Sequence, residues 1–189
     1  MPALRPVFFV ALDENDLAVK RMQSFMTVQP GESVGCVGCH ESRVQTPRSA
    51  RSALALRRPP SAIEPITDAP DVGDFPRDIQ PVLDRHCLAC HDCDKTAKGG
   101  PMAGGILLVG DRGPMFSHSY YTLTISAQFA DGRNLRRSNY PPRALGSSAS
   151  PLLKKLDGHH YSVQATERER KLVRLWTDSV YVKDGATKW

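Results

Sequence analysis

Two copies of the pentapeptide Cys-x-x-Cys-His, at residues 36–40 and 87–91, are the part of this chain best suited to chemistry. Two thiols with this spacing can add across the vinyl groups of one haem, and the next histidine then lies under the ring as an axial ligand of the iron. The pattern predicts two covalently bound c-type haems. The residues predicted to attach and ligate them are Cys36, Cys39, His40, Cys87, Cys90 and His91.

The repeated motif is specific because cysteine and histidine are rare here. With 5 Cys and 6 His among 189 residues, random placement gives about 0.004 matches per chain. One alternative is a zinc site with four thiolate ligands. Zinc ribbons separate their cysteine pairs by about 15–20 residues, whereas these pairs are about 50 apart. The other alternative is one disulfide within each motif. The fifth cysteine, Cys93, is interpreted as structurally incidental.

The sixth iron position decides between electron transfer and catalysis. A second histidine gives a low potential, methionine raises it, and an open position allows a small ligand to bind. For the second haem we favour His160, with its neighbour His159 as the residue most easily confused with it. Other histidines and methionines have packing as their ordinary role. Met102 and Met115 are alternative ligands of the second haem, and Met22 and Met26 are candidate ligands of the first. His118 is a candidate for either haem, and His86 is assigned to packing.

Composition excludes some classes of function. The formal charge is +5 with a pI near 9.1, but two haems would add roughly four negative charges, and the arginines are not interleaved with aromatic residues. We therefore expect no nucleic-acid binding. No stretch approaches the ~18 apolar residues of a membrane span. No signal peptide is visible, although c-type haem is attached outside the cytoplasm, so we expect a C-terminal piece of a longer exported, periplasmic protein.

The predicted elements give an α+β fold. An N-terminal β-hairpin or partial sheet carries the first motif, and a mostly α-helical cytochrome c-like domain carries the second. The hairpin is expected either to join a sheet formed upstream or to pack on the first haem. The predicted domains are 1–45, a Pro/Arg-rich linker at 46–73, and 74–189. The predicted elements are a hairpin at 7–28, helices at 75–86, near 116–123, after Ser150-Pro151 and at 167–181, a strand at 106–109 and a loop at 126–149. Thr166 to Glu169 form a capping box.

Several runs resemble the hydrazine synthase alpha subunit family. They are Ala11–Glu32, Gly35–Glu41, Phe75–His91, Pro141-Pro142, Gly146-Ser147, Ser150–Leu152 and Gly158–His160. The resemblance implies an upstream β-propeller-like region, two haems per chain and a distal histidine in the Gly-His-His segment. It also implies an axial tyrosine shortly after the first motif. The first tyrosine of this chain is Tyr120, so we do not expect hydrazine formation to carry over.

The main functional hypothesis is a dihaem cytochrome c module for electron transfer, with a redox partner protein and the upstream domain as its partners. The competing hypothesis is an oxidoreductase whose first haem, ligated by His40, has an open position for a small nitrogen or oxygen species. A third hypothesis, a zinc-stabilised structural module, involves no redox chemistry.

Overall fold

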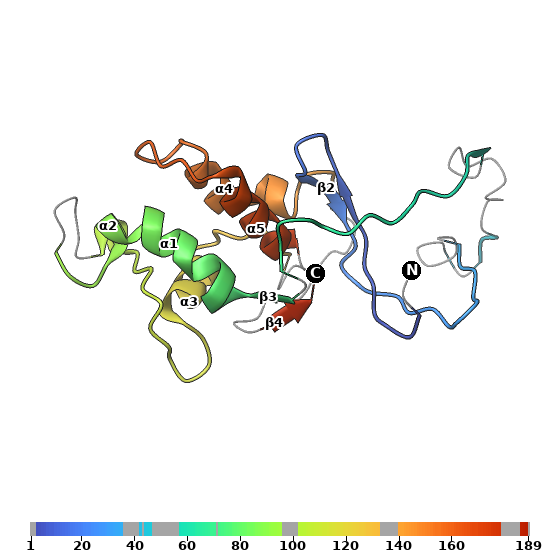
Figure 1. Ribbon diagram of the computed structural model, residues 1–189, viewed down its shortest axis with the longest axis horizontal. Helices are drawn as coiled ribbons and strands as arrows, with labels where there is room; N and C mark the ends of the chain where they lie inside the picture. The colour runs from blue at the N-terminus through green and yellow to red at the C-terminus, as the bar shows by residue number, and fades with distance from the viewer. Residues whose placement is uncertain are drawn as a thin grey trace. The chain divides into compact units, whose positions relative to one another are not determined.

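The structure, a computed structural model, describes residues 3–35, 42, 44–46, 57–70, 72–95, 102–132, 140–178 and 186–188. The chain forms two units, one from residues 1–7 and 25–67 and the other from residues 8–24 and 68–189. Two small antiparallel sheets and five α-helices occur in the described residues (Figure 1), which confirms the predicted α+β class. The predicted ranges 1–45, 46–73 and 74–189 stay predictions.

The described residues of the first unit contain little regular structure. Val7 and Met26 form an isolated antiparallel bridge, and each backbone N–H donates to the other's carbonyl over 2.9 Å. Leu4 N–H donates to the Val28 carbonyl over 2.8 Å. Residues 59–66 are irregular, as their prolines predict.

The second unit begins with the predicted hairpin. Strands β1 (Val10–Leu12) and β2 (Ala18–Arg21) pair antiparallel. The turn forms around Asp13, whose Oδ1 accepts the backbone N–H groups of Asn15 and Leu17 over 2.9 Å each. Aspartate favours such turns because its side chain satisfies the donors that the reversing chain leaves unpaired.

The helical part follows residue 70. Its elements are β3 (Val72–Asp74), the π-helical turn η3 (Phe75–Ile79), α1 (Gln80–His86), α2 (Leu88–His91), the 3₁₀ turn η4 (Ala103–Gly105), α3 (His118–Ile125), the 3₁₀ turn η5 (Ser147–Ala149), α4 (Pro151–Leu156), α5 (Glu167–Asp178) and β4 (Ala186–Lys188). Strands β3 and β4 pair antiparallel. No helix in the described parts of the chain has the length and apolar character that a membrane crossing requires.

Local sequence explains where these helices begin. Asp74 Oδ1 accepts Arg77 N–H over 3.0 Å at the start of η3. At α5 the predicted capping box is confirmed, because Thr166 N–H donates to Glu169 Oε2 over 2.8 Å and Glu169 N–H donates to Thr166 Oγ1 over 3.3 Å. Ser150 precedes α4 as predicted, but its hydroxyl accepts Ala130 N–H over 2.9 Å instead of capping the helix.

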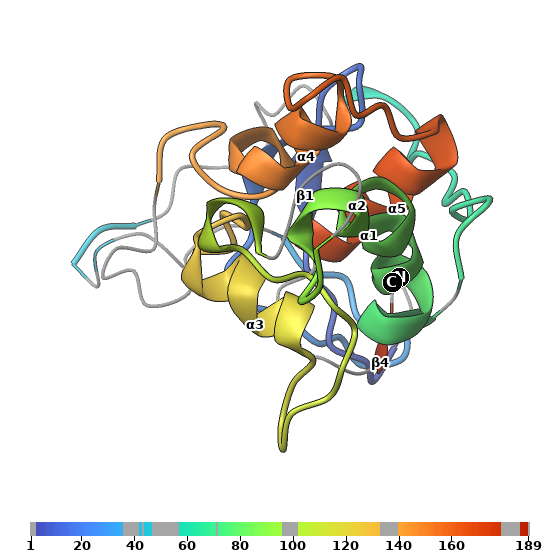
Figure 2. The same cartoon turned by 90° about the vertical axis from the view of Figure 1, so that its left-hand side faces the viewer.

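Aromatic rings form the centre of the core, around which α1, α3, α4 and α5 pack (Figure 2). The Phe75 ring centroid lies 5.0 Å from that of Trp176 and 5.4 Å from that of Tyr120. Phe129 meets Trp176 edge-on, with 4.4 Å between centroids. Phe75 lies in η3, directly before α1, and Trp176 lies on α5, so this ring contact joins the start of α1 to α5.

The hairpin is fastened to the helical part of its own unit. Ala18 N–H donates to Ser147 Oγ over 2.8 Å, and Ser147 N–H donates to Asp178 Oδ1 over 2.6 Å. Arg21, 7 % exposed, donates to the carbonyl of Thr177 over 3.0 Å. The hairpin and the helical part come closest together at Gly146, where a Cβ would lie only 2.8 Å from the Cβ of Ala18. Gly146 also has a φ of +82°, which glycine adopts more readily than other residues.

The predicted strand at 106–109 is wrong. These residues pair with no strand among the described residues. Their polar groups find other partners, because Leu108 N–H donates to the His91 carbonyl over 2.9 Å and Gln80 Nε2 donates to the Leu108 carbonyl over 3.0 Å. The segment is therefore a wall attached to α1 and α2.

Candidate functional site

The second Cys-x-x-Cys-His motif continues directly from helix α1. Cys87 N–H donates to the Leu83 carbonyl over 2.7 Å. The Cys87 carbonyl then accepts Cys90 N–H over 3.1 Å and His91 N–H over 3.0 Å. Residues three and four apart on a helical turn share a face. Helix α1 therefore delivers both thiols and the imidazole to the same side.

The His91 ring is oriented by the wall segment. Its Nδ1 lies 3.2 Å from the Ile106 carbonyl oxygen, so Nδ1 carries the proton that is donated to it. Such a bond fixes the ring and leaves Nε2 with its lone pair available to a metal. Leu108, two residues after Ile106, is itself hydrogen-bonded to the Gln80 side chain and to the His91 carbonyl. These bonds hold the segment that carries the Ile106 carbonyl in place.

His160 lies in the loop between α4 and α5 and faces His91. Their ring centroids are 6.0 Å apart and their planes differ by 21°. The loop is held by Gly158 N–H donating to the Val163 carbonyl over 2.7 Å and Val163 N–H donating to the His160 carbonyl over 3.0 Å. Burial lowers the pKa of His160, and the charges of His91 and Lys155 lower it further. A neutral imidazole is the form that binds a metal.

A cavity of about 230 Å³ is lined by residues of α1–α2, α3 and α4 and includes these side chains. Cys87, Cys90, His91 and His160 all line it. Burial, with smaller contributions from Cys90 and Asp84, raises the pKa of the Cys87 thiol to about 11. The rest of the wall is mostly aliphatic; its large apolar members are Ile106, Leu108, Leu123, Leu152, Leu156 and Val163.

These residues fit a covalently attached haem. His91 and His160 are close enough for both imidazoles to bind one metal ion, with 6.0 Å between their ring centroids. The apolar wall suits a porphyrin face. Gln128 Oε1 also belongs to a residue of this wall, and it is a buried acceptor without a donor among the described residues. A haem has no N–H or O–H group to donate to this oxygen at neutral pH, so the partner of the oxygen would be a water molecule or another donor.

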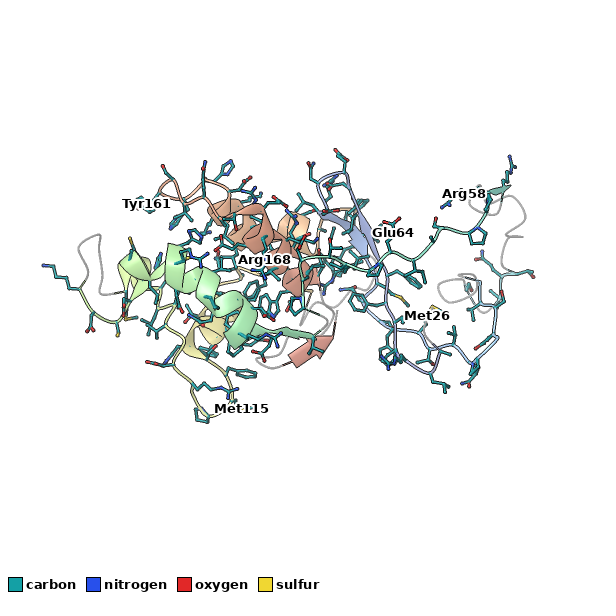
Figure 3. All side chains as sticks on the ribbon, viewed as in Figure 1. Met26, Arg58, Glu64, Met115, Tyr161 and Arg168 are labelled. Atoms are coloured by element: carbon teal, nitrogen blue, oxygen red, sulfur yellow. The ribbon has the colours of Figure 1, made fainter. Side chains whose placement is uncertain are left out.

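Other predicted ligands of the second haem lie elsewhere. His159 is exposed, and its Nδ1 lies 3.1 Å from the Asp157 carbonyl. Met115 is 75 % exposed at a loop tip (Figure 3), and Met102 and His118 line a separate shallow pocket with α3. His86 lines the cavity and its Nε2 lies 3.1 Å from Glu169 Oε2, which is the packing role expected of it.

The first motif, Cys36 to His40, lies outside the described residues. Its haem, and Met22 and Met26 as ligands of that haem, therefore stay predictions. The zinc alternative stays open for the same reason, because a four-cysteine site would need Cys36 and Cys39.

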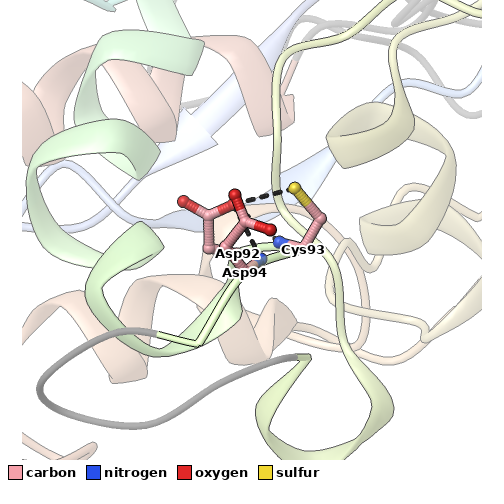
Figure 4. Close-up of side chains that lie close together, drawn as sticks. All are labelled: Asp92, Cys93 and Asp94. Atoms are coloured by element: carbon pink, nitrogen blue, oxygen red, sulfur yellow. Dashed lines mark hydrogen bonds between the residues drawn. The ribbon is translucent and has the colours of Figure 1, made fainter.

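Cys93 lies just beyond the second motif, beside two carboxylates (Figure 4). Its Sγ is 3.2 Å from Asp92 Oδ1, and possible ligand atoms of Asp92, Cys93 and Asp94 lie within 4.8 Å of one another. The hydrogen bond to Asp92 raises the pKa of the Cys93 thiol. Cys93 and Asp94 are exposed and Asp92 is half-buried, and nothing else at this turn indicates a function.

A comparison with models of protein families agrees with the sequence resemblance over the start of the chain. Residues 1–41 match the sequence model of the hydrazine synthase alpha subunit middle domain. This match supports the prediction of a hydrazine synthase alpha-like chain. Neither a search of the curated proteins nor a search of the solved structures finds a match.

Proposed function

We propose that this chain is a dihaem c-type cytochrome module for electron transfer, and that it forms the C-terminal part of a larger exported hydrazine synthase alpha-like protein. The observation that carries the proposal is the pair of facing imidazoles, His91 and His160, across an apolar cavity that both cysteines of the second motif line. The match of residues 1–41 supports the family context.

Each residue has a defined task in this proposal. Cys87 and Cys90 attach the haem edge, and His91 and His160 provide the two axial nitrogens. When bound, the haem iron supplies one-electron redox chemistry at low potential, which bis-histidine ligation favours. The Ile106 carbonyl holds the His91 ring, and the aliphatic wall excludes water from it. With His91 and His160 both bound to it, the iron would serve electron transfer and would have no free position for a substrate.

The remaining parts of the proposal concern the rest of the protein. Cys36, Cys39 and His40 attach the first haem, and electrons pass between the two haems and an external redox partner protein. The upstream domain of the parent protein is the second partner. Attachment of c-type haem places the protein in the periplasm or otherwise outside the cytoplasm.

The haem content is tested by a pyridine haemochrome spectrum of protein exported in a host that matures c-type haem. Two covalent haems per chain are expected, and one is expected after Cys87→Ala and Cys90→Ala. If folded wild-type protein contains zinc and no haem, the cytochrome proposal is wrong.

The axial ligand is tested by comparing His160→Ala with His159→Ala, a matched neighbour whose ring bonds its own loop. Electron paramagnetic resonance should show a low-spin to high-spin change of one haem in the first variant and none in the second. The same change in His159→Ala, or no change in His160→Ala, would contradict the ligand assignment.

A further inference from the structure

One residue of the cavity wall, Lys155, has no oppositely charged partner among the described residues. Lys155 lies on α4, three residues after Leu152 and next to Leu156, both of which line the cavity beside it. Residues three apart share a helix face, so the aliphatic stem of Lys155 lies along the apolar wall. Its side chain is half-buried, whereas that of the preceding Lys154 is exposed.

Among the residues that the structure describes, no carboxylate pairs with the charge of Lys155. No Asp or Glu occurs among the described residues that line the cavity. Lys155 makes no hydrogen bond or ion pair with any described residue, and the one interaction that it has is a charge effect on His160, which is unfavourable to protonated imidazole. The nearest acidic residue along the chain, Asp157, has its Oδ1 3.3 Å from Arg170 Nη1.

Because the stem of Lys155 lies along the apolar wall, its ammonium group stands at the edge of the cavity, where it can pair with an anion that a ligand supplies. A haem is apolar over most of its surface and carries two carboxylates on propionate arms. The described lining of the cavity is complementary to such a ligand, because it combines a mostly aliphatic wall with one lysine, Lys155. Charge-assisted hydrogen bonds of this kind are about twice as strong as neutral ones.

We propose that the Lys155 ammonium group pairs with a propionate carboxylate of the haem attached at Cys87 and Cys90. This inference rests on the haem proposed above and adds a residue that fixes the orientation of the macrocycle. The pair also compensates a negative charge close to the iron. Compensation favours the reduced haem, which carries one more electron, and therefore raises the midpoint potential.

The test compares haem-loaded full-length wild type with Lys155→Met, Lys155→Gln, Lys155→Arg and the matched control Lys154→Met. The first readout is the propionate bending band in the resonance Raman spectrum. We expect this band to shift in the Met and Gln variants at 155, and to keep its position in the control. The second readout is the midpoint potential, which should fall in the same two variants and return toward the wild-type value with arginine.

Each outcome decides the proposal. An unmoved propionate band in Lys155→Met and Lys155→Gln overturns the pairing, even where the potential falls, because a bare charge alters the potential through space. Equal shifts in Lys154→Met and Lys155→Met overturn it as well. Failure of the haem proposal is recognised separately, since wild-type protein would then lack the haemochrome of the second site.

Discussion

Glu169 connects the start of α5 to the end of the helix that delivers Cys87. Its side chain is 7 % exposed, and its Oε2 accepts Thr166 N–H over 2.8 Å and Thr166 Oγ1–H over 2.9 Å and lies 3.1 Å from His86 Nε2. Its other oxygen pairs with Arg85. Burial raises the pKa of this carboxyl, but the bonds from Thr166 and His86 outweigh it and lower the pKa to about 2.

Replacing Glu169 with Gln should destabilise the folded chain by about 2 kcal/mol at pH 7. A hydrogen bond to a charged group contributes about 1.5–3 kcal/mol, and Gln keeps one acceptor oxygen while losing the charge. The exposed pair with Arg85 adds no more than about 1 kcal/mol. Glu167→Gln is the matched control, because Glu167 stands in the same helical turn but is 65 % exposed. Its cost should stay below about 1 kcal/mol.

The assay is urea denaturation of the haem-loaded chain followed by far-UV circular dichroism, repeated between pH 7 and pH 3. The pKa of Glu169 is lower in the folded state than its ordinary value of 4.5. Its stabilisation is therefore complete above that value and is lost as the pH falls toward about 2. The difference between wild type and Glu169→Gln should shrink below pH 4.5. A difference that is constant down to pH 3, or equal to that of Glu167→Gln, would refute this reasoning.

Three further predictions concern the core and the attachment of the hairpin. Phe75→Ala should cost about 3–5 kcal/mol in urea denaturation, because the ring is fully buried against Trp176, whereas Phe75→Leu should cost less. Gly146→Ala should lower the midpoint of thermal unfolding, corresponding to more than about 1 kcal/mol, since φ is +82° and its Cβ would lie 2.5 Å from Asp178 Oδ1; a midpoint equal to wild type would contradict this. Burial raises the pKa of Asp178, so wild type should lose stability as the pH rises through that pKa, and Asp178→Asn should lack this dependence in parallel denaturation series.

Local patterns predicted the elements that depend on neighbouring residues. The capping box from Thr166 to Glu169 and the Asp13 turn were readable because each is completed within four residues. The Cys-x-x-Cys-His spacing likewise indicates its own chemistry. His160 could be proposed from its place after a short helix, but its position opposite His91 depends on how that helix packs.

Features that depend on distant partners could not be predicted. The 106–109 segment has the apolar character of a strand, yet Gln80 and His91 take its hydrogen bonds. The hydrogen bond between Ala18 of the hairpin and Ser147 could not be predicted from the sequence, because the two residues are 129 positions apart. Lys155 could have been placed on the face of Leu152 by helical spacing, but nothing local indicates that this face borders a cavity.

The attachment of the hairpin has a consequence for how the protein matures. Ala18 and Ser147, which hydrogen-bond directly, are 129 residues apart, and closing so long a loop carries an entropic cost that grows with its length. During synthesis, the hairpin therefore cannot make this bond until the segment that contains Ser147 has been made. Residues 25–67, which include the first motif, leave the second unit and return to it, and are topologically an insertion. In the proposed function, Cys87 and Cys90 are synthesised before Ser147, so haem could be attached to them before the second unit closes around the cavity.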